Sequence, residues 1–247
     1  MAISFVGSNT NTALSTGTLT IDLSGIAIQE GDVVYVATSG NGTDLDVVEE
    51  SGTYTELATD LFADDSSNLN FAVFRKVQGA TPDTSVTINN GGNSTIAGLV
   101  YVLRGVDNDT PEDATPTTLS STAGTGTPNP PSIETVTAGA WVLPFAGSTE
   151  ADDVTSAPTD YTDLVDVQGA AANVMVSRRE IASPGTEDPG TYGGISGTTA
   201  DPVCAITVAV RPAAEETGRT GTMAATETGA DDATASGAVV VAGTLDA

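Results

Sequence analysis

This chain of 247 residues consists largely of short β-type segments separated by clusters of Gly, Asn, Asp and Pro, a pattern that few folds can accommodate. The segments alternate polar and apolar residues or form short apolar runs, and no longer stretch has the apolar period of a helix. Thr, Val, Ser and Gly are abundant and lysine is nearly absent, which disfavours helices. We predict an all-β sandwich or barrel with strands at Ala2–Val6, Leu19–Leu23, Asp32–Thr38, Tyr54–Ala58, Leu69–Val77, Ser85–Ile88, Ala97–Leu103, Ser132–Val136, Ala140–Ala146, Tyr161–Val167, Asn173–Ile181 and Val203–Val210.

A second pattern repeats a group of four of these segments along the chain. In three of the four matches the two segments are separated by the same number of residues, the number that separates Arg104 from Arg211. In the fourth match the two segments lie slightly closer together in the sequence, and all four matches occur in the same order. The matched segments are Gly31–Val36 with Ala138–Leu143, Tyr54–Leu57 with Tyr161–Leu164, Asn70–Lys76 with Asn173–Arg179, and Ala97–Arg104 with Cys204–Arg211. Strands rich in Val and Thr also resemble one another by chance, but the shared order favours an internal duplication. Because a sheet of four or five strands needs a second layer over its apolar face, we predict that residues 1–106 and 132–212 form two related halves of one antiparallel sandwich.

Two further segments differ from the strands in composition. Residues 107–131 are rich in Thr, Pro, Ser and Gly, and prolines at this density disfavour ladder pairing, so we expect an exposed crossover between the halves. Residues 213–247 are rich in Ala, Thr, Gly and acidic residues and contain no aromatic residue, so they cannot bury enough surface to fold alone. We expect an extended C-terminal arm that adds as a strand to a partner protein or a neighbouring copy. The residues that we predict to bind the partner are Gly221, Thr222, Met223, Val239, Val240, Val241 and Leu245.

Charge and composition exclude several classes of function. The chain carries 33 acidic and 7 basic residues, a net charge of −26, and so repels the phosphate backbone of nucleic acids. The absence of histidine and the single cysteine exclude Ser-His-Asp and Cys-His catalysis, histidine metal sites and an intrachain disulfide. The first residues show no leader pattern and no apolar run is long enough for a membrane helix, so we expect a product made in a cytoplasm without membrane contact. We predict a protein that is not an enzyme and acts through its surfaces.

One resemblance depends on motifs at the ends of the two halves. Residues 101–107 read Tyr-Val-Leu-Arg-Gly-Val-Asp and residues 110–114 read Thr-Pro-Glu-Asp-Ala. Residues 208–213 read Val-Ala-Val-Arg-Pro-Ala, and residues 221–231 form an Ala/Thr/Glu/Gly-rich repeat. These motifs resemble a family of bacteriophage virion and tail-fibre-associated β-sandwich proteins, although Glu112 stands where an apolar residue is usual. The resemblance implies a jelly-roll-like sandwich, a place on the virion surface after synthesis in the host cytoplasm, and no catalytic residue.

Two sets of charged residues are candidate ligand sites. Asp107, Asn108 and Asp109 supply three oxygen-bearing side chains at a strand exit, which suits Ca²⁺, although solvated turn acids give the same pattern. The other set consists of arginines at matching positions of the two halves, namely Arg75, Arg104, Arg178 and Arg211. Such arginines bind a partner's carboxylates or, as we favour in so acidic a chain, acids of their own sandwich.

These observations predict an accessory surface subunit of a virion, either head decoration (cement) or a short spike. We expect it to form a symmetric homo-oligomer such as a trimer, bound to other virion proteins and without a resident cofactor other than a possible Ca²⁺. The alternative is a tail-fibre or adhesin module that binds host-surface carbohydrate. That alternative requires exposed aromatic side chains, for which Tyr192, or Trp141 with Tyr35 at the matching position, would be candidates, although Trp141 and Tyr35 fit a core better.

Overall fold

The computed structural model describes residues 1–40, 46–48, 53–57, 61–63, 69–121, 127–148, 154–170, 172–194 and 202–215. These residues form an antiparallel all-β fold, as predicted, and none of them is helical. The strands are β1 (Ser4–Asp22), β2 (Val33–Gly40), β3 (Asp46–Val48), β4 (Thr55–Glu56), β5 (Leu61–Ala63), β6 (Leu69–Val77), β7 (Ser85–Arg104), β8 (Thr117–Ser121), β9 (Ile133–Thr135), β10 (Ala140–Ser148), β11 (Thr162–Gln168), β12 (Asn173–Ile181), β13 (Gly185–Glu187) and β14 (Val203–Val210). A search of the described residues finds no helix with the length and apolarity needed to span a membrane.

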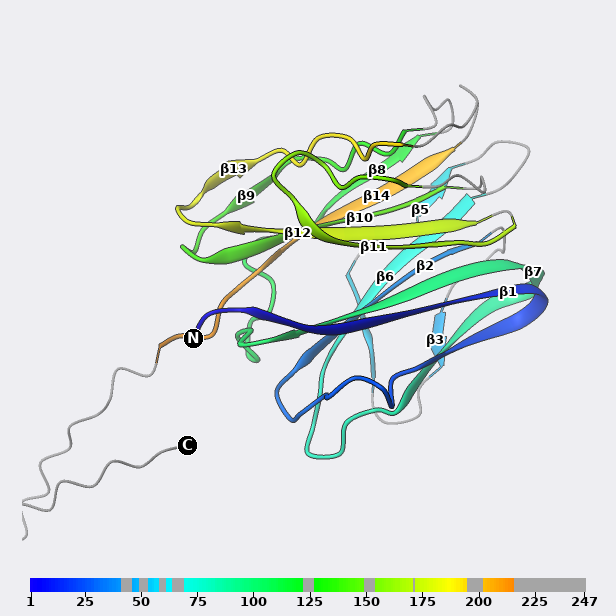
Figure 1. Ribbon diagram of the computed structural model, residues 1–247, viewed down its shortest axis with the longest axis horizontal. Helices are drawn as coiled ribbons and strands as arrows, with labels where there is room; N and C mark the ends of the chain where they lie inside the picture. Colours follow the sequence, from blue (N-terminus) through cyan, green and yellow to red (C-terminus); the bar gives the residue numbers. More distant parts are fainter. Residues whose placement is uncertain are drawn as a thin grey trace, which may run out of the picture. The chain divides into compact units, whose positions relative to one another are not determined.

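Two large sheets lie face to face and form a sandwich (Figure 1). The first sheet has the strand order β1-β7-β2-β6-β4, with β3 paired to β7 and β5 paired to β6. The second sheet has the order β11-β12-β10-β14-β8, and β13 and β9 form a separate small ladder. The apolar side chains that face each other across the sandwich form the main core, which includes Tyr35, Phe71 and Tyr101 from the first sheet and Trp141 and Phe145 from the second. Both halves therefore contribute to one interior.

The two sheets share one strand order. The series β7-β2-β6-β4 of the first sheet corresponds to β14-β10-β12-β11 of the second, and the edge strand β1 corresponds to β8. The ladder registers agree with the predicted matches of β6 with β12, of β4 with β11 and of β7 with β14. The predicted halves are therefore related in topology as well as in sequence.

The predicted match between β2 and β10 is wrong by one residue. The matched segments place Trp141 opposite Val34, but Val33 pairs with Leu103 and Trp141 pairs with Val210, which is the counterpart of Leu103. Val33 and Trp141 both face the main core, whereas Val34 belongs to a cluster on the other face of its sheet. Trp141 therefore corresponds to Val33, and the expected match between Trp141 and Tyr35 does not occur.

Strands β1 and β7 are much longer than predicted because each joins two of the expected strands. They pair along almost their whole length, with irregularities between Phe5 and Gly7 and between Ala13 and Thr18. Side chains from their far ends pack on the outer face of the first sheet and form a second core. Gly98 permits this close approach, since a Cβ there would lie 2.7 Å from the Ile88 side chain.

The expectation of an unpaired crossover at residues 107–131 is wrong for five residues. Residues 117–121 form β8, which pairs with β14 from Thr117 opposite Thr207 to Ser121 opposite Val203. This stretch contains no proline, so its backbone N–H groups are available for a ladder at the sheet edge. The prolines of the segment lie on either side of it, and the crossover contains an edge strand of the second sheet.

Candidate functional site

The predicted calcium ligands lie in the turn that follows β7. The Asp107 carboxylate accepts hydrogen bonds from the backbone N–H groups of Asp109 (3.0 Å) and Thr110 (3.1 Å). The Asn108 carboxamide, oriented so that both polar atoms are satisfied, donates to the carbonyls of Gly31 (2.9 Å) and Val106 (3.2 Å). Two of the three side chains therefore hold the turn itself. No group of three or more acidic or cysteine side chains within the described ranges could hold a metal ion, and a calcium site here stays a prediction.

The predicted partner-binding residues fall in the C-terminal segment. Only Ala213, Ala214 and Glu215 of residues 213–247 belong to the described part of the chain. Outside it lie Gly221, Thr222, Met223, Val239, Val240, Val241 and Leu245. Their role in binding a partner stays a prediction.

Each basic side chain that the structure describes forms an ion pair with a carboxylate of the same chain. The pairs and their shortest distances are Arg75–Glu112 (2.9 Å), Lys76–Asp83 (2.8 Å), Arg104–Asp32 (2.7 Å), Arg178–Asp163 (2.5 Å), Arg179–Glu187 (2.7 Å) and Arg211–Asp113 (3.3 Å). The seventh basic residue, Arg219, lies outside the described residues. The four arginines at matching positions therefore bind acids of their own sandwich, which is the interpretation that the sequence favoured.

The matching residues Arg104 and Arg211 each bind an acid that is almost completely buried. Arg104 makes a bidentate contact with Asp32 at 2.8 and 2.7 Å. Arg211 contacts Asp113, which also accepts the backbone N–H groups of Val136 (2.6 Å) and Thr137 (3.0 Å). Because a buried carboxylate is costly unless it is paired, these arginines stabilise the ends of β7 and β14.

A cluster of a tyrosine, an acid and a cation occurs at one edge of the first sheet. The Tyr54 hydroxyl donates to Asp83 (3.0 Å), and the Lys76 ammonium donates to both oxygens of Asp83 (2.8 and 3.0 Å). Burial raises the pKa of the Tyr54 phenol well above its usual range, and the negative charge of Asp83 raises it further. The phenol is therefore a neutral hydrogen-bond donor, and the cluster ties β6 to the segments on either side of it.

The same cluster recurs in the second half. The Tyr161 hydroxyl donates to Glu187 (3.0 Å), to which Arg179 donates at 2.7 Å. Burial and then the Glu187 carboxylate raise the pKa of Tyr161, as in the first cluster. Tyr161 and Arg179 are the counterparts of Tyr54 and Lys76 in the sequence repeat. The acid lies outside the matched segments and was missed.

The aromatic residues considered for carbohydrate binding are buried. Trp141 is only 4% exposed in the main core, and the Arg178 guanidinium lies 4.0 Å from its ring centroid. Tyr192 is fully buried, and its hydroxyl donates to the Pro144 carbonyl at 2.5 Å. Tyr35 is fully buried as well. These three rings are therefore not available to stack on a sugar.

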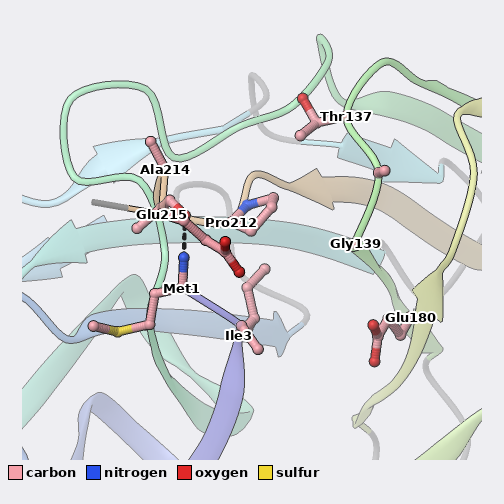
Figure 2. Close-up of a pocket in the computed structure, with 11 residues that line it drawn as sticks. Met1, Ile3, Thr137, Gly139, Glu180, Pro212, Ala214 and Glu215 are labelled. Carbon is pink, nitrogen blue, oxygen red and sulfur yellow. Dashed lines mark hydrogen bonds between the residues drawn. The ribbon is translucent and has the colours of Figure 1, made fainter. Parts of the chain in front are cut away.

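A shallow pocket lies where the chain leaves β14 (Figure 2). It has a volume of about 380 Å³ and is lined by residues 1–3, 137–139, 180 and 212–215. The Met1 amino group donates to the Ala213 carbonyl at 2.6 Å beside the pocket. Ile3 and Pro212 supply apolar surface, and Glu180 and Glu215 add carboxylates. This lining suits an apolar or cationic side chain better than an anion.

Comparison with known proteins adds no relative to this description: no family model, curated protein or solved structure matches the chain.

Proposed function

We propose that this protein is a non-enzymatic accessory subunit of a virion surface, a head decoration protein or short spike that forms homo-oligomers and attaches to other virion proteins through its C-terminal segment. The observation that carries this proposal is that the described sandwich uses its basic side chains for its own ion pairs and buries the rings of Trp141, Tyr35 and Tyr192. Such a body is a rigid scaffold whose function lies in its surface and its attached segment.

Two further observations support the proposal. The motifs at residues 101–107 and 208–213 resemble phage virion proteins, and they form the ends of β7 and β14, where they pack beside each other through the Val106–Pro212 bridge. The pairing of the described basic side chains leaves a surface dominated by carboxylates, because acids outnumber basic residues 33 to 7. Neighbouring copies then repel one another, and salt or divalent ions weaken this repulsion. Attachment is therefore expected to strengthen as NaCl or Ca²⁺ is added.

The test is to locate the protein in particles from the organism that encodes it. Particles purified on a density gradient are analysed by mass spectrometry and labelled with a gold-conjugated antibody against the full chain. We expect the protein in the particles and the label on their surface. Its absence from the particles, or label only on internal material, would contradict the proposal.

A deletion then tests the attachment segment. Removal of residues 216–247 leaves the compact unit Met1–Glu215 and is expected to abolish incorporation into particles without changing the near-ultraviolet circular dichroism of the sandwich. The matched control replaces only residues 216–232 by a Gly/Ser linker of equal length, and we expect it to be incorporated. Undiminished incorporation of the deletion variant would show that attachment uses another surface.

A further inference from the structure

We infer that the open edge of β8 is a docking site for the C-terminal segment of a second copy of this chain, which adds residues 238–242 as an antiparallel strand. This inference rests on the proposed role of the C-terminal segment in attachment, and it names one partner of that segment. The edges of the two large sheets differ in a way that singles out β8, and the C-terminal segment contains a suitable occupant.

Three of the four sheet edges carry features that oppose further pairing. On β1, the Asn9 side-chain amide donates to the Asp22 carbonyl and the Asn11 side-chain amide donates to the Thr20 carbonyl, each at 2.7 Å. Two backbone acceptors near the C-terminal end of β1 are therefore already occupied. The opposite edge of the first sheet consists of β4 and β5, which have two and three residues. On β11, the ladder is irregular between Thr162 and Val165, and acids lie in the strand. Short strands, irregular pairing and charges are the usual protection of sheet edges.

The edge at β8 lacks these features. Its five residues, Thr-Thr-Leu-Ser-Ser, include no charge and no proline. Its register with β14 is unbroken from Thr117 to Ser121, and within the described residues β8 pairs with β14 alone. Thr118, in the middle of the strand, is exposed. A regular, neutral edge of this kind is the template on which an extended peptide adds as a strand.

The internal repeat sharpens this contrast. The counterpart of β8 in the first sheet is β1, which has 19 residues and closes its edge with Asn9 and Asn11. The second half has the same strand position with five residues and none of these caps. The first half therefore protects this edge position with its own residues, whereas the second half leaves the corresponding edge of its sheet available to another strand.

The C-terminal segment contains a matching occupant. Residues 233–245 carry no charge, and within them Val239, Val240 and Val241 lie between Gly237 and Gly243. Consecutive β-branched residues favour strands, and a neutral strand is the one that an acidic protein can bring to a neutral edge without added repulsion. The preceding segment, residues 216–232, spans at most about 60 Å when extended, which is enough to reach a neighbouring molecule.

Strand direction favours a second copy over the same chain. Thr207, near the end of β14, pairs with Thr117 at the start of β8, so the chain leaves the sheet beside the start of β8. A segment that turned back directly from there would run parallel to β8. Each ladder of the described fold is antiparallel, and antiparallel pairing is the more stable kind. For the same chain to pair antiparallel, its linker must first pass along the whole edge of β8 and turn back, whereas a second copy can add its segment in the antiparallel direction without that detour.

The test is disulfide trapping between two different full-length chains, both with Cys204→Ala to remove the buried native thiol. One chain carries Thr118→Cys on β8, and the other carries Val239→Cys, Val240→Cys or Val241→Cys. The matched control places Thr162→Cys on the exposed edge of β11 instead. We expect a mixed disulfide dimer with Thr118→Cys but not with Thr162→Cys, and we expect alternate positions of the valine run to react because side chains of a strand alternate between faces.

A second pair of variants tests the same edge without cysteine. Thr118→Glu is expected to abolish self-association in sedimentation velocity, whereas Thr162→Glu leaves it intact, with near-ultraviolet circular dichroism unchanged in both. Trapping that is equal at both edges, or absent at Thr118, would overturn the inference. So would a disulfide that forms only when Thr118→Cys and a cysteine in the valine run are placed in the same chain. These measurements use purified protein, so their failure is distinguishable from absence of the protein in particles, which would contradict the proposed function.

Discussion

The two halves of the sandwich share a strand order but differ in what covers their outer faces. The first sheet is covered by the far ends of its own long strands, with Leu19, Ile21 and Ile88 against Val34 and Val100. The second sheet is covered by connecting segments, whose side chains form two smaller clusters around Tyr161 and Tyr192. The comparison shows that the repeated strands determine the order of each sheet, whereas the segments between them determine how each apolar outer face is removed from water.

Alkaline titration shows whether the two halves unfold together, and its effect on stability is greater than that of any single substitution below. All five tyrosines have a pKa raised mainly by burial, Tyr35, Tyr54 and Tyr101 in the first half and Tyr161 and Tyr192 in the second. Above the ordinary pKa of 10.0, the unfolded chain loses protons that the folded chain retains, so the stability contributed by these phenols is fully present below pH 10 and falls as pH rises beyond it. The loss is about 1.4 kcal/mol per pH unit for each tyrosine.

Absorbance of phenolate at alkaline pH measures this transition. Because the main core contains side chains of both sheets, we expect all five tyrosines to ionise in one step that coincides with the loss of far-ultraviolet circular dichroism. Two steps, one from the three tyrosines of the first half and one from the two of the second, would show that the halves are independent. Ionisation at pH 10 with the fold intact would contradict the burial of the phenols.

The next effect compares the two tyrosine–acid–cation clusters. In the first, the side chains of Lys76 and Asp83 are 11% and 2% exposed, whereas in the second those of Arg179 and Glu187 are 37% and 12% exposed. Asp83→Ala removes the acid that both the buried Lys76 ammonium and the Tyr54 hydroxyl contact, and it is expected to cost about 3–5 kcal/mol, as for other broken buried pairs. Glu187→Ala leaves a guanidinium that water reaches, so we expect about 1–2 kcal/mol, mostly from the lost Tyr161 bond.

Urea unfolding at pH 7 measures both variants, with Tyr54→Phe and Tyr161→Phe as controls that remove only the hydroxyl contact. Equal losses for Asp83→Ala and Glu187→Ala would show that burial does not distinguish the clusters. A larger loss in the second half would reverse the comparison.

The sequence was sufficient for the central strands of both sheets and for the relation of the two halves, because both depend on local patterns, whereas the short strands β3, β5, β8 and β13 were not predicted. Alternation and turn residues located the strand at Asn173–Ile181, and the repeat related it to β6. The sequence pattern did not predict that two expected strands join into β1. The middle of β1 is rich in Ser, Thr and Asn, a composition typical of loops, and this stretch becomes a strand only because it pairs with β7. Pairing over a long sequence separation overrides local preference there.

The acids of the ion pairs were missed for a different reason. The chain has 33 acidic residues, and spacing alone does not show which of them are buried. Asp83 and Asp113 are recognisable only once the fold brings Lys76 and Arg211 against them. The four matching arginines indicated the ion pairs better than the acids did, because basic residues are rare in this chain and each basic side chain that the structure describes is paired with a carboxylate.

The smallest effect compares two glycines that the corrected match between β2 and β10 makes equivalent. Gly31 and Gly139 precede β2 and β10 with φ angles of 83° and 78°, a conformation that costs about 1–2 kcal/mol for an L-residue. Gly31→Ala and Gly139→Ala are therefore both expected to lower the free energy of unfolding by that amount. A Cβ at Gly31 would also lie 2.9 Å from the Asn108 carboxamide, whereas at Gly139 the nearest atom, in Pro212, is 4.0 Å away.

We therefore expect Gly31→Ala to cost a few tenths of a kcal/mol more than Gly139→Ala, because Asn108 must move and lose a bond to a carbonyl of its own turn. Urea unfolding of both variants measures the difference, and Gly31→Ala combined with Asn108→Ala separates its causes. If the contact with Asn108 produces the difference, the glycine substitution costs the same in the Asn108→Ala background as at Gly139. If the difference persists there, the two turns differ in backbone strain, and the halves are less alike than their shared strand order indicates.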